Sequence, residues 1–228
     1  DIRGIAGKDL SADLARKLGR AYVKLAEARL KKTGLTLAVG RDCRITGEEY
    51  AGALIEGLSS MGAKVLSLGQ VTTPMTYFSI HNRNLDGAIM VTGSHNPPNY
   101  NGFKICIGKA TLHGPDIQEL RALMEKDAGK GTTAPVAPEK FDIFPPYLDF
   151  LQSNLNINRP LKIVVDAGNG AGSDFAPAIF KKFGCEVIEL FCTPDGTFPN
   201  HPADPTVEEN LQEVIAAVKK HGADCGLA

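Results

Sequence analysis

The chain has 228 residues, 43% of them hydrophobic and 22% charged, and its formal net charge is −1. This length and composition allow one large or two modest globular domains. A nearly neutral chain without a long Lys/Arg run is unsuited to binding nucleic acid or a membrane surface through bulk charge. No apolar run reaches the roughly 18 residues that a membrane-spanning helix needs. We therefore expect neither a nucleic acid nor a membrane as a partner.

The first half of the chain alternates apolar runs with amphipathic segments, which is the pattern of β-strands and α-helices. Ser11 is placed to cap the first helix, and Thr46 with Glu49 three residues later is the pattern of a capping box. In chain order the expected elements are a helix from Ser11 to near residue 32, a strand at 35–40, a helix at 47–62, a strand at 63–69, a helix at 74–82, strands at 86–93 and 102–108, and a helix at 115–126.

Residues 127–146 are rich in Gly, Pro, Thr and Ala and show little periodicity, which is typical of a linker. We expect a first domain at 1–135, a linker at 136–146 and a second domain at 147–228. A short helix at 147–156 is expected to begin the second domain.

The second half of the chain repeats the order strand, helix, strand, helix, strand. Its segment "LKIVVDAGNGAG" (161–172) stands where "LTLAVGRDCRITG" (35–47) stands in the first half, and Thr206 with Glu209 is another capping-box pattern. Such alternation favours layered sheets with mainly parallel pairing. We therefore predict an α/β fold of two three-layer α/β/α domains with mostly parallel mixed sheets.

The five cysteines form no C-x-x-C pair, and their number is odd. Several lie in apolar runs, so we expect reduced, buried thiols in a cytoplasmic protein rather than a disulfide framework or a zinc site. They are Cys43, Cys106, Cys185, Cys192 and Cys225. Both ends of the chain are abrupt, so we also expect it to be a piece of a longer protein.

The loop "TGSHNPPNYNG" (92–102) is the first candidate for chemistry, because ligands of parallel α/β sheets bind past the carboxyl ends of the strands. The equivalent loop of the second half would follow Ala228. Ser94 is a weak nucleophile unless a neighbour takes its proton or positive charge stabilises it. His95, Lys104 and Arg3 are the candidate neighbours.

The same loop is rich in residues that restrict the backbone. Gly93 permits a close approach, Pro97 and Pro98 fix two φ angles, and Asn101-Gly102 predicts a turn that brings Lys104 back toward Ser94. The alternative is a Ser/Asn-rich turn without chemistry. Acyl transfer has weak support, because no glycine follows two residues after Ser94 and no Asp–His triad is evident.

Three other segments have two interpretations each. In "GRDCRITG" (40–47), Arg41 and Arg44 beside a helix N-terminus could bind an anion, or Asp42 could pair with one arginine and brace the loop. The spacing of "DAGNGAG" (166–172) departs from that of a dinucleotide loop and favours a tight turn. His201, in "DGTFPNHPADP" (195–205), is either structural or on the substrate side of the sheet.

No D-x-D-x-D cluster is present, so a Mg²⁺-dependent reaction would need its main ligands outside these residues.

Taken in order, "DIRG", "GRDCRITG", "TPM", "TGSHNPPNYNGFKI", "DAGNGAG" and "DGTFPNHPADP" resemble the α-D-phosphohexomutases, and among them the bacterial phosphomannomutase/phosphoglucomutase type. The resemblance covers essentially the whole chain, and "TGSHNPPNYNGFK" is its most specific part. It implies a phosphoglucomutase-like fold in which this chain is the first domain and most of the second. Domains 3 and 4 of the same chain would be absent, and so would the family's "DGDGDR"-type metal loop.

The resemblance also implies an activity. Ser94 would be carried as phosphoserine and would interconvert hexose 1-phosphate and hexose 6-phosphate, of glucose or mannose, through a bound 1,6-bisphosphate. Mg²⁺ would bind the phosphate on Ser94, with its remaining ligands beyond Ala228, and the fragment alone would be inactive.

The resemblance assigns roles to further residues. Arg3 and Lys104 would supply positive charge, Lys104 or His95 would assist proton transfer, and Asn96 would hold the loop shape. Arg41 and Asp42 would support the loop from behind. The alternatives are a phosphoglucosamine mutase and a non-catalytic module that binds sugar phosphates.

Overall fold

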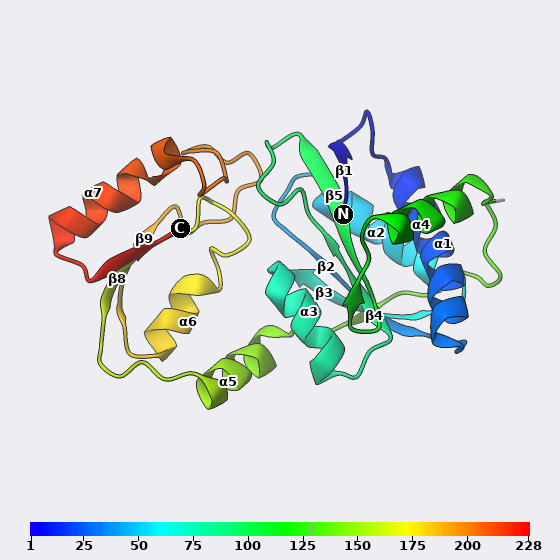
Figure 1. Cartoon of the computed structure of the whole chain (residues 1–228), viewed down its shortest axis with the longest axis horizontal. Coiled ribbons are helices and arrows are strands. Elements are labelled where there is room, and N and C mark those ends of the chain that lie inside the picture. The colour runs from blue at the N-terminus through cyan, green and yellow to red at the C-terminus, as the bar shows by residue number, and fades with distance from the viewer. Residues whose placement is uncertain (128) are drawn as a thin grey trace. The chain divides into compact units, whose positions relative to one another are not determined.

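The computed structural model describes residues 1–127 and 129–228 (Figure 1). The chain forms two compact units, residues 1–94 with 99–143 and residues 95–98 with 144–228. All five cysteines are free thiols, although only Cys106 and Cys185 are buried and Cys225 is exposed. Among the residues described, no helix is both long and apolar enough to cross a membrane.

The first unit is built on a mixed sheet of seven strands. Its order is β1 (Ile2–Ile5), β5 (Tyr100–Ile107), β4 (Gly87–Val91), β2 (Thr36–Arg41), β3 (Lys64–Gln70) and β7 (Glu139–Lys140), with β6 (Ala110–Thr111) beside β5. Strands β4, β2, β3 and β7 are parallel, whereas β5 is antiparallel to both β1 and β4. The carboxyl ends of β2, β3 and β4 therefore lie at one edge of this sheet.

Helices cover both faces of this sheet (Figure 1). Helices α1 (Ala12–Leu30), α2 (Gly47–Ser59) and α4 (Pro115–Glu125) cover one face, and α3 (Thr73–Asn82) covers the other. The alternation of side chains along β2 explains the layers: Leu37 and Val39 pack into the core with α1 and α2, whereas Gly40 faces Thr76 of α3.

Helix α1 begins where the sequence predicts, because the Ser11 side chain accepts a hydrogen bond from the Leu14 amide. It packs closely against α2 at two glycines. A Cβ atom on Gly57 would lie 2.1 Å from the Arg16 carbonyl oxygen, and one on Gly19 would lie 2.6 Å from the Leu54 carbonyl oxygen. The two helix backbones approach to a distance that only glycine permits.

The second unit has a parallel sheet of three strands in the order β10 (Cys225–Leu227), β8 (Lys162–Asp166), β9 (Glu186–Leu190). Its helices are α5 (Phe144–Asn154), α6 (Ala176–Lys182) and α7 (Gln212–His221), with a 3₁₀ turn, η1 (Glu208–Leu211), before α7. Ile163 and Val165 of β8 pack on the side of α6, and Val164 packs against α7. This unit is also a three-layer sandwich, so the predicted fold class is confirmed for both halves.

The internal repeat is visible in the strand order. The third, first and second strands of the repeat are neighbours as β4-β2-β3 in the first unit and as β10-β8-β9 in the second, and all are parallel. The shared architecture predicted from the alternating elements is therefore present.

Both predicted capping boxes are wrong. Thr46 makes no side-chain cap and instead accepts a hydrogen bond from Asn101. The hydroxyl of Thr206 donates to the Asp204 carboxylate, and the helical segment begins later, at Glu208. In both places the threonine hydroxyl forms a hydrogen bond with another polar side chain instead of with a backbone amide of the helix.

The segment predicted as a linker, 136–146, is partly ordered structure. Strand β7 pairs in parallel with β3, Ile143 is fully buried, and helix α5 begins at Phe144 rather than at 147. The edge strand β3 offers unpaired backbone groups that even a proline-rich segment can bind.

Candidate active site

Ser94 lies in the loop that follows β4, at the carboxyl edge of the first sheet. Its φ of 55° is left-handed, a conformation that non-glycine residues rarely adopt. The Ser94 amide donates to the Thr92 hydroxyl at 2.9 Å, and its carbonyl accepts from the Arg44 guanidinium at 3.0 Å. Both backbone polar groups of Ser94 are thus held.

Arg44 belongs to the loop between β2 and α2, and its side chain is almost fully buried, with 1% exposed. Its Nη2 donates to Ser94, its Nη1 donates to the Tyr100 carbonyl at 2.9 Å, and its Nε lies 3.2 Å from Asp42 Oδ2. Burial lowers the pKa of Arg44, and the Asp42 carboxylate opposes this shift. Asp42 therefore braces the loop by pairing with Arg44, as one of the two sequence interpretations proposed.

Asn101 and Gly102 do not form the predicted turn. Both lie in strand β5, and the chain reverses earlier, between Ser94 and Tyr100. The buried amide of Asn101 donates to the Thr46 hydroxyl at 3.0 Å. A Cβ on Gly102 would lie 2.2 Å from the Ile2 carbonyl oxygen, so this glycine permits the close approach of β1.

Arg3 on β1 and Lys104 on β5 meet at a shared carboxylate. Asp1 Oδ2 accepts from Arg3 Nη2 at 2.7 Å and from Lys104 Nζ at 2.9 Å. Burial lowers the pKa of Lys104 below its ordinary value of 10.5, and the positive charge of Arg3 lowers it further. The two cations chosen from the sequence are therefore neighbours, and one anion can bind both.

The remaining predicted site residues are Arg41, His95 and Asn96. Arg41 ends β2 and donates to the Asp42 carbonyl at 3.1 Å, with Glu48 3.7 Å from its second terminal nitrogen. His95 is exposed and Asn96 is half-buried. Both belong to the segment 95–98, which is part of the second compact unit.

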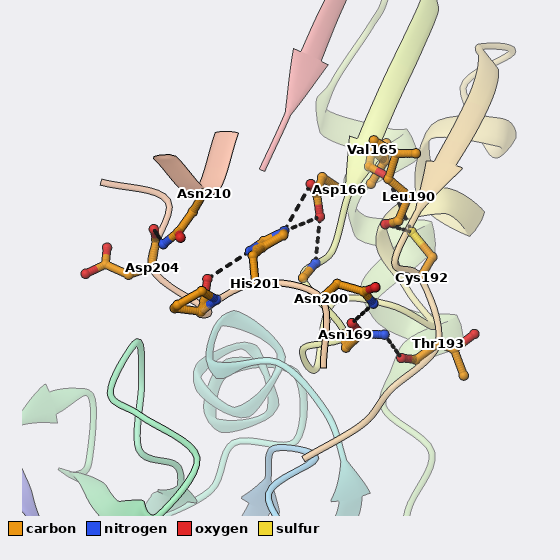
Figure 2. A network of polar contacts seen from close by, with 12 residues as sticks. Val165, Asp166, Asn169, Leu190, Cys192, Thr193, Asn200, His201, Asp204 and Asn210 are labelled. Atoms are coloured by element: carbon orange, nitrogen blue, oxygen red, sulfur yellow. Dashed lines mark hydrogen bonds and ion pairs between the residues drawn. The ribbon is translucent and has the colours of Figure 1, made fainter. Parts of the chain in front are cut away.

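In the second unit, two loops at the carboxyl edge of the sheet are joined by polar side chains (Figure 2). Asn169, at φ 57°, donates to the Thr193 carbonyl at 2.9 Å and accepts from Asn200 at 2.7 Å. The Gly168 amide donates to the Asp166 carboxylate at 2.9 Å. "DAGNGAG" is therefore the tight turn that the sequence favours.

His201 has a structural setting in the same network (Figure 2). Its Nδ1 lies 2.9 Å from the Pro202 carbonyl, and its Nε2 lies 3.2 Å from both carboxylate oxygens of Asp166. Burial lowers the pKa of His201, but these two hydrogen-bond acceptors outweigh it and raise the pKa above its ordinary value, which favours a proton on both ring nitrogens.

The described residues include no group of three or more His, Cys, Asp or Glu side chains arranged to hold a metal ion.

Sequence reasoning missed several residues of this site. The sequence indicates Arg44 only as an anion ligand or as a partner of Asp42, and it points to no role in the loop for Asp1, Thr92 or Thr46. The Asn-Gly pair was misinterpreted, because its turn propensity is local while its burial depends on β1 and α2. The charged pattern Arg-Asp-x-Arg after a strand was the one available signal for Arg44.

The chain thus consists of two α/β/α units in sequence. In the first, the backbone of Ser94 is fixed by hydrogen bonds in the loop at the carboxyl edge of the sheet. Residues 1–130 match the family model of phosphoglucomutase/phosphomannomutase α/β/α domain I, and residues 145–228 match that of domain II. The chain belongs to the phosphoglucomutase/phosphomannomutase family.

Relatives support this membership. The chain is 46% identical to a phosphoglucomutase of Neisseria gonorrhoeae and 42% identical to a phosphomannomutase/phosphoglucomutase of Pseudomonas aeruginosa, in each case over its whole length. It spans 49% and 48% of these two proteins. The crystal structure of a phosphoglucomutase/phosphomannomutase family protein from Burkholderia thailandensis superposes with a TM-score of 0.91 at 43% identity, over 99% of this chain and 50% of that one.

Proposed function

We propose that this chain carries the phosphoserine half of a hexose-phosphate mutase that acts on glucose or mannose phosphates in the cytoplasm. The observation that carries the proposal is Ser94, held at the carboxyl end of β4 in a chain that matches domains I and II of this family. Arg3 and Lys104, which already share one anion, support phosphoryl binding near this edge.

The reaction is a transfer of one phosphoryl group in each direction. The bond between Ser94 Oγ and phosphorus breaks as the 6-hydroxyl oxygen of a hexose 1-phosphate binds the phosphorus, which forms the 1,6-bisphosphate. After the intermediate turns over, the phosphoryl group at C1 passes to Ser94 Oγ, and the 6-phosphate is released. Such transfers depend mainly on positioning and on fixed charge around the phosphoryl oxygens.

Lys104 is the group we assign to the sugar hydroxyl. A lysine with a lowered pKa is neutral more often at a given pH and can accept the proton of the attacking hydroxyl. The Arg3 guanidinium stabilises the phosphoryl oxygens, His95 assists proton transfer, and Asn96 holds the loop.

Mg²⁺ would provide charge neutralisation at the phosphate on Ser94 when bound, and we place its other ligands outside residues 1–228. The chain spans about half the length of the curated relatives that it matches, and we place domains 3 and 4 of the mutase in the rest of the full-length protein. We therefore expect the 228-residue chain alone to show no mutase turnover.

Intact-mass analysis of the full-length protein that contains these residues tests the role of Ser94. The protein incubated with glucose 1,6-bisphosphate should gain the mass of one phosphate and convert glucose 1-phosphate. Ser94→Ala should lose both, whereas Ser153→Ala, on the exposed surface of α5, should keep both. If Ser94→Ala still gains the phosphate and converts glucose 1-phosphate, the proposal is refuted.

The same preparation separates the two alternatives. A non-catalytic module would bind glucose 1-phosphate in a calorimeter but never gain a phosphate. A phosphoglucosamine mutase would turn over glucosamine 1-phosphate faster than the glucose and mannose compounds.

A further inference from the structure

The backbone of Ser94 needs a physical explanation. A left-handed φ brings the side chain of an L-residue too close to the backbone, and such a conformation persists only where the surroundings hold it. Ser94 adopts it at φ 55° in a loop, without a helix or a sheet ladder to hold it. The groups that bind its amide and carbonyl therefore determine where its hydroxyl lies.

Arg44 is the strongest of these groups. Its planar guanidinium spans the two ends of the loop, with Nη2 on the Ser94 carbonyl at 3.0 Å and Nη1 on the Tyr100 carbonyl at 2.9 Å. The Asp42 carboxylate accepts hydrogen bonds from Arg44 Nε at 3.2 Å and from the Arg44 backbone amide at 3.0 Å. The guanidinium is therefore itself held in place by a residue of the β2–α2 loop.

Gly93 shows how closely the guanidinium lies against the loop. A Cβ at this position would be 2.5 Å from Arg44 Cζ and 2.6 Å from Nε. These distances are shorter than any van der Waals contact, so a side chain at 93 and the observed position of Arg44 exclude each other.

We propose that Arg44 is a positioning residue for the reaction: it holds Ser94 in the left-handed conformation by binding the carbonyls at both ends of the loop. This inference rests on the proposed function. Arg44 acts through the backbone of Ser94 and is not assigned to the phosphoryl group. Lysine cannot replace it, because one ammonium lacks the planar fork that serves two carbonyls and a carboxylate together.

The test uses the full-length protein with Arg44→Met and Arg44→Lys, and with Arg16→Met as the matched control. Arg16 is a salt-bridged arginine of α1, 2.9 Å from Glu56, and lies outside the loop. We expect Arg44→Met to lower kcat about 100-fold, as a misplaced reacting group does, with KM changed less than about threefold. Arg44→Lys should recover little of this loss, and Arg16→Met should keep both constants.

Hydrogen exchange of the peptide 92–100 gives an independent readout. It should quicken about tenfold or more in Arg44→Met and stay unchanged in Arg16→Met, because only the former releases the loop. If Arg44→Met does not fold, Gly93→Ala carries the test, since it keeps the arginine and its charge in the protein and displaces the guanidinium from the loop. We expect the same fall in kcat and the same faster exchange.

Three results would overturn the proposal: a folded Arg44→Met with kcat within about threefold of wild type, Arg44→Lys with wild-type kcat, or unchanged exchange of 92–100 in a variant whose kcat falls. Wild-type protein without any turnover would instead refute the proposed function. The exchange experiment then decides alone whether Arg44 holds the loop.

Discussion

His201 and Asp166 join the two loops at the carboxyl edge of the second sheet, with Nε2 of the histidine 3.2 Å from both carboxylate oxygens (Figure 2). The Asp166 side chain is fully buried, and 12% of the His201 side chain is exposed. The contact connects the carboxyl end of β8 with the segment that precedes α7, and the two residues are 35 positions apart in the sequence. Phe191 packs edge-on against the same imidazole ring.

We expect this pair to make the stability of the second unit depend on pH. Burial opposes the positive charge of His201, but the Pro202 carbonyl and the Asp166 carboxylate outweigh it, with a smaller contribution from Glu213. The pKa of His201 therefore lies above its ordinary value of 6.5. A histidine with a raised pKa stabilises the folded state fully below its unfolded pKa, and the stabilisation is lost as the pH rises through the folded pKa.

We expect His201→Gln to destabilise the second unit by about 2 kcal/mol near pH 6 and by less at pH 9, because glutamine keeps a donor but not the charge. Hydrogen exchange of peptides from β8, measured between pH 6 and pH 9 and corrected for intrinsic rates, reports this difference. The control is His113→Gln, an exposed histidine of the first unit, which should leave β8 unchanged. A His201→Gln effect that grows with pH would show that the ring is not held as a cation.

Lys104 is expected to titrate below free lysine, since burial and the charge of Arg3 both lower its pKa. The carboxylate of Asp1, 2.9 Å from Lys104 Nζ, favours the charged form and limits this shift. Asp1→Asn should therefore lower the pKa of Lys104 further, and Arg3→Gln should raise it.

Nuclear magnetic resonance of ¹³C-dimethylated lysines follows these two titrations, with a dimethylated lysine peptide as the reference. Opposite shifts in the two variants are the expected result. Shifts of the same sign, or no shift in either variant, would refute the shared-anion arrangement of Arg3 and Lys104. In the full-length enzyme, mutase activity should rise with pH as Lys104 loses its proton.

The contact between α1 and α2 predicts opposite effects for the same substitution at two glycines of one helix. At Gly57 a Cβ would lie 2.1 Å from the Arg16 carbonyl oxygen, which belongs to a rigid helix backbone. Gly57→Ala should therefore destabilise the first unit by about 2–3 kcal/mol. At Gly52 nothing lies within 4 Å of the added atom, so Gly52→Ala should stabilise α2 by about 0.5–1 kcal/mol.

Urea unfolding followed by circular dichroism measures both changes in the free energy of unfolding. An m-value equal to that of wild type shows that the variants expose the same surface on unfolding. A Gly57→Ala variant as stable as wild type would mean that α1 and α2 can move apart without a loss in the free energy of unfolding. A destabilising Gly52→Ala would mean that this face of α2 is covered.

Much of the fold was predictable because its signals are local. The alternation of apolar strands and amphipathic helices predicted the layers, and Ser11 marked the start of α1 through a cap that depends on three residues of chain. The repeat of strand, helix, strand, helix, strand also predicted that both units share one architecture, which their common strand order confirms.

The candidate site was less predictable, since its geometry depends on residues far apart in the chain. Asn101-Gly102 has the sequence of a turn, yet Asn101 is buried against Thr46 and Gly102 is pressed against β1. The two capping boxes failed because other polar side chains engaged their threonines.

The sequence by itself determined the α/β/α layers of both halves, the position of Ser94 after a sheet strand, and the resemblance to the family that the chain belongs to. Only the tertiary structure decided that Arg44 binds both ends of the Ser94 loop, that Asp1 links Arg3 to Lys104, and that the His201 ring lies against the Asp166 carboxylate. Periodicity and caps arise from contacts within a few residues. Hydrogen bonds between loops form only when the sheet brings the ends of separate strands to one edge.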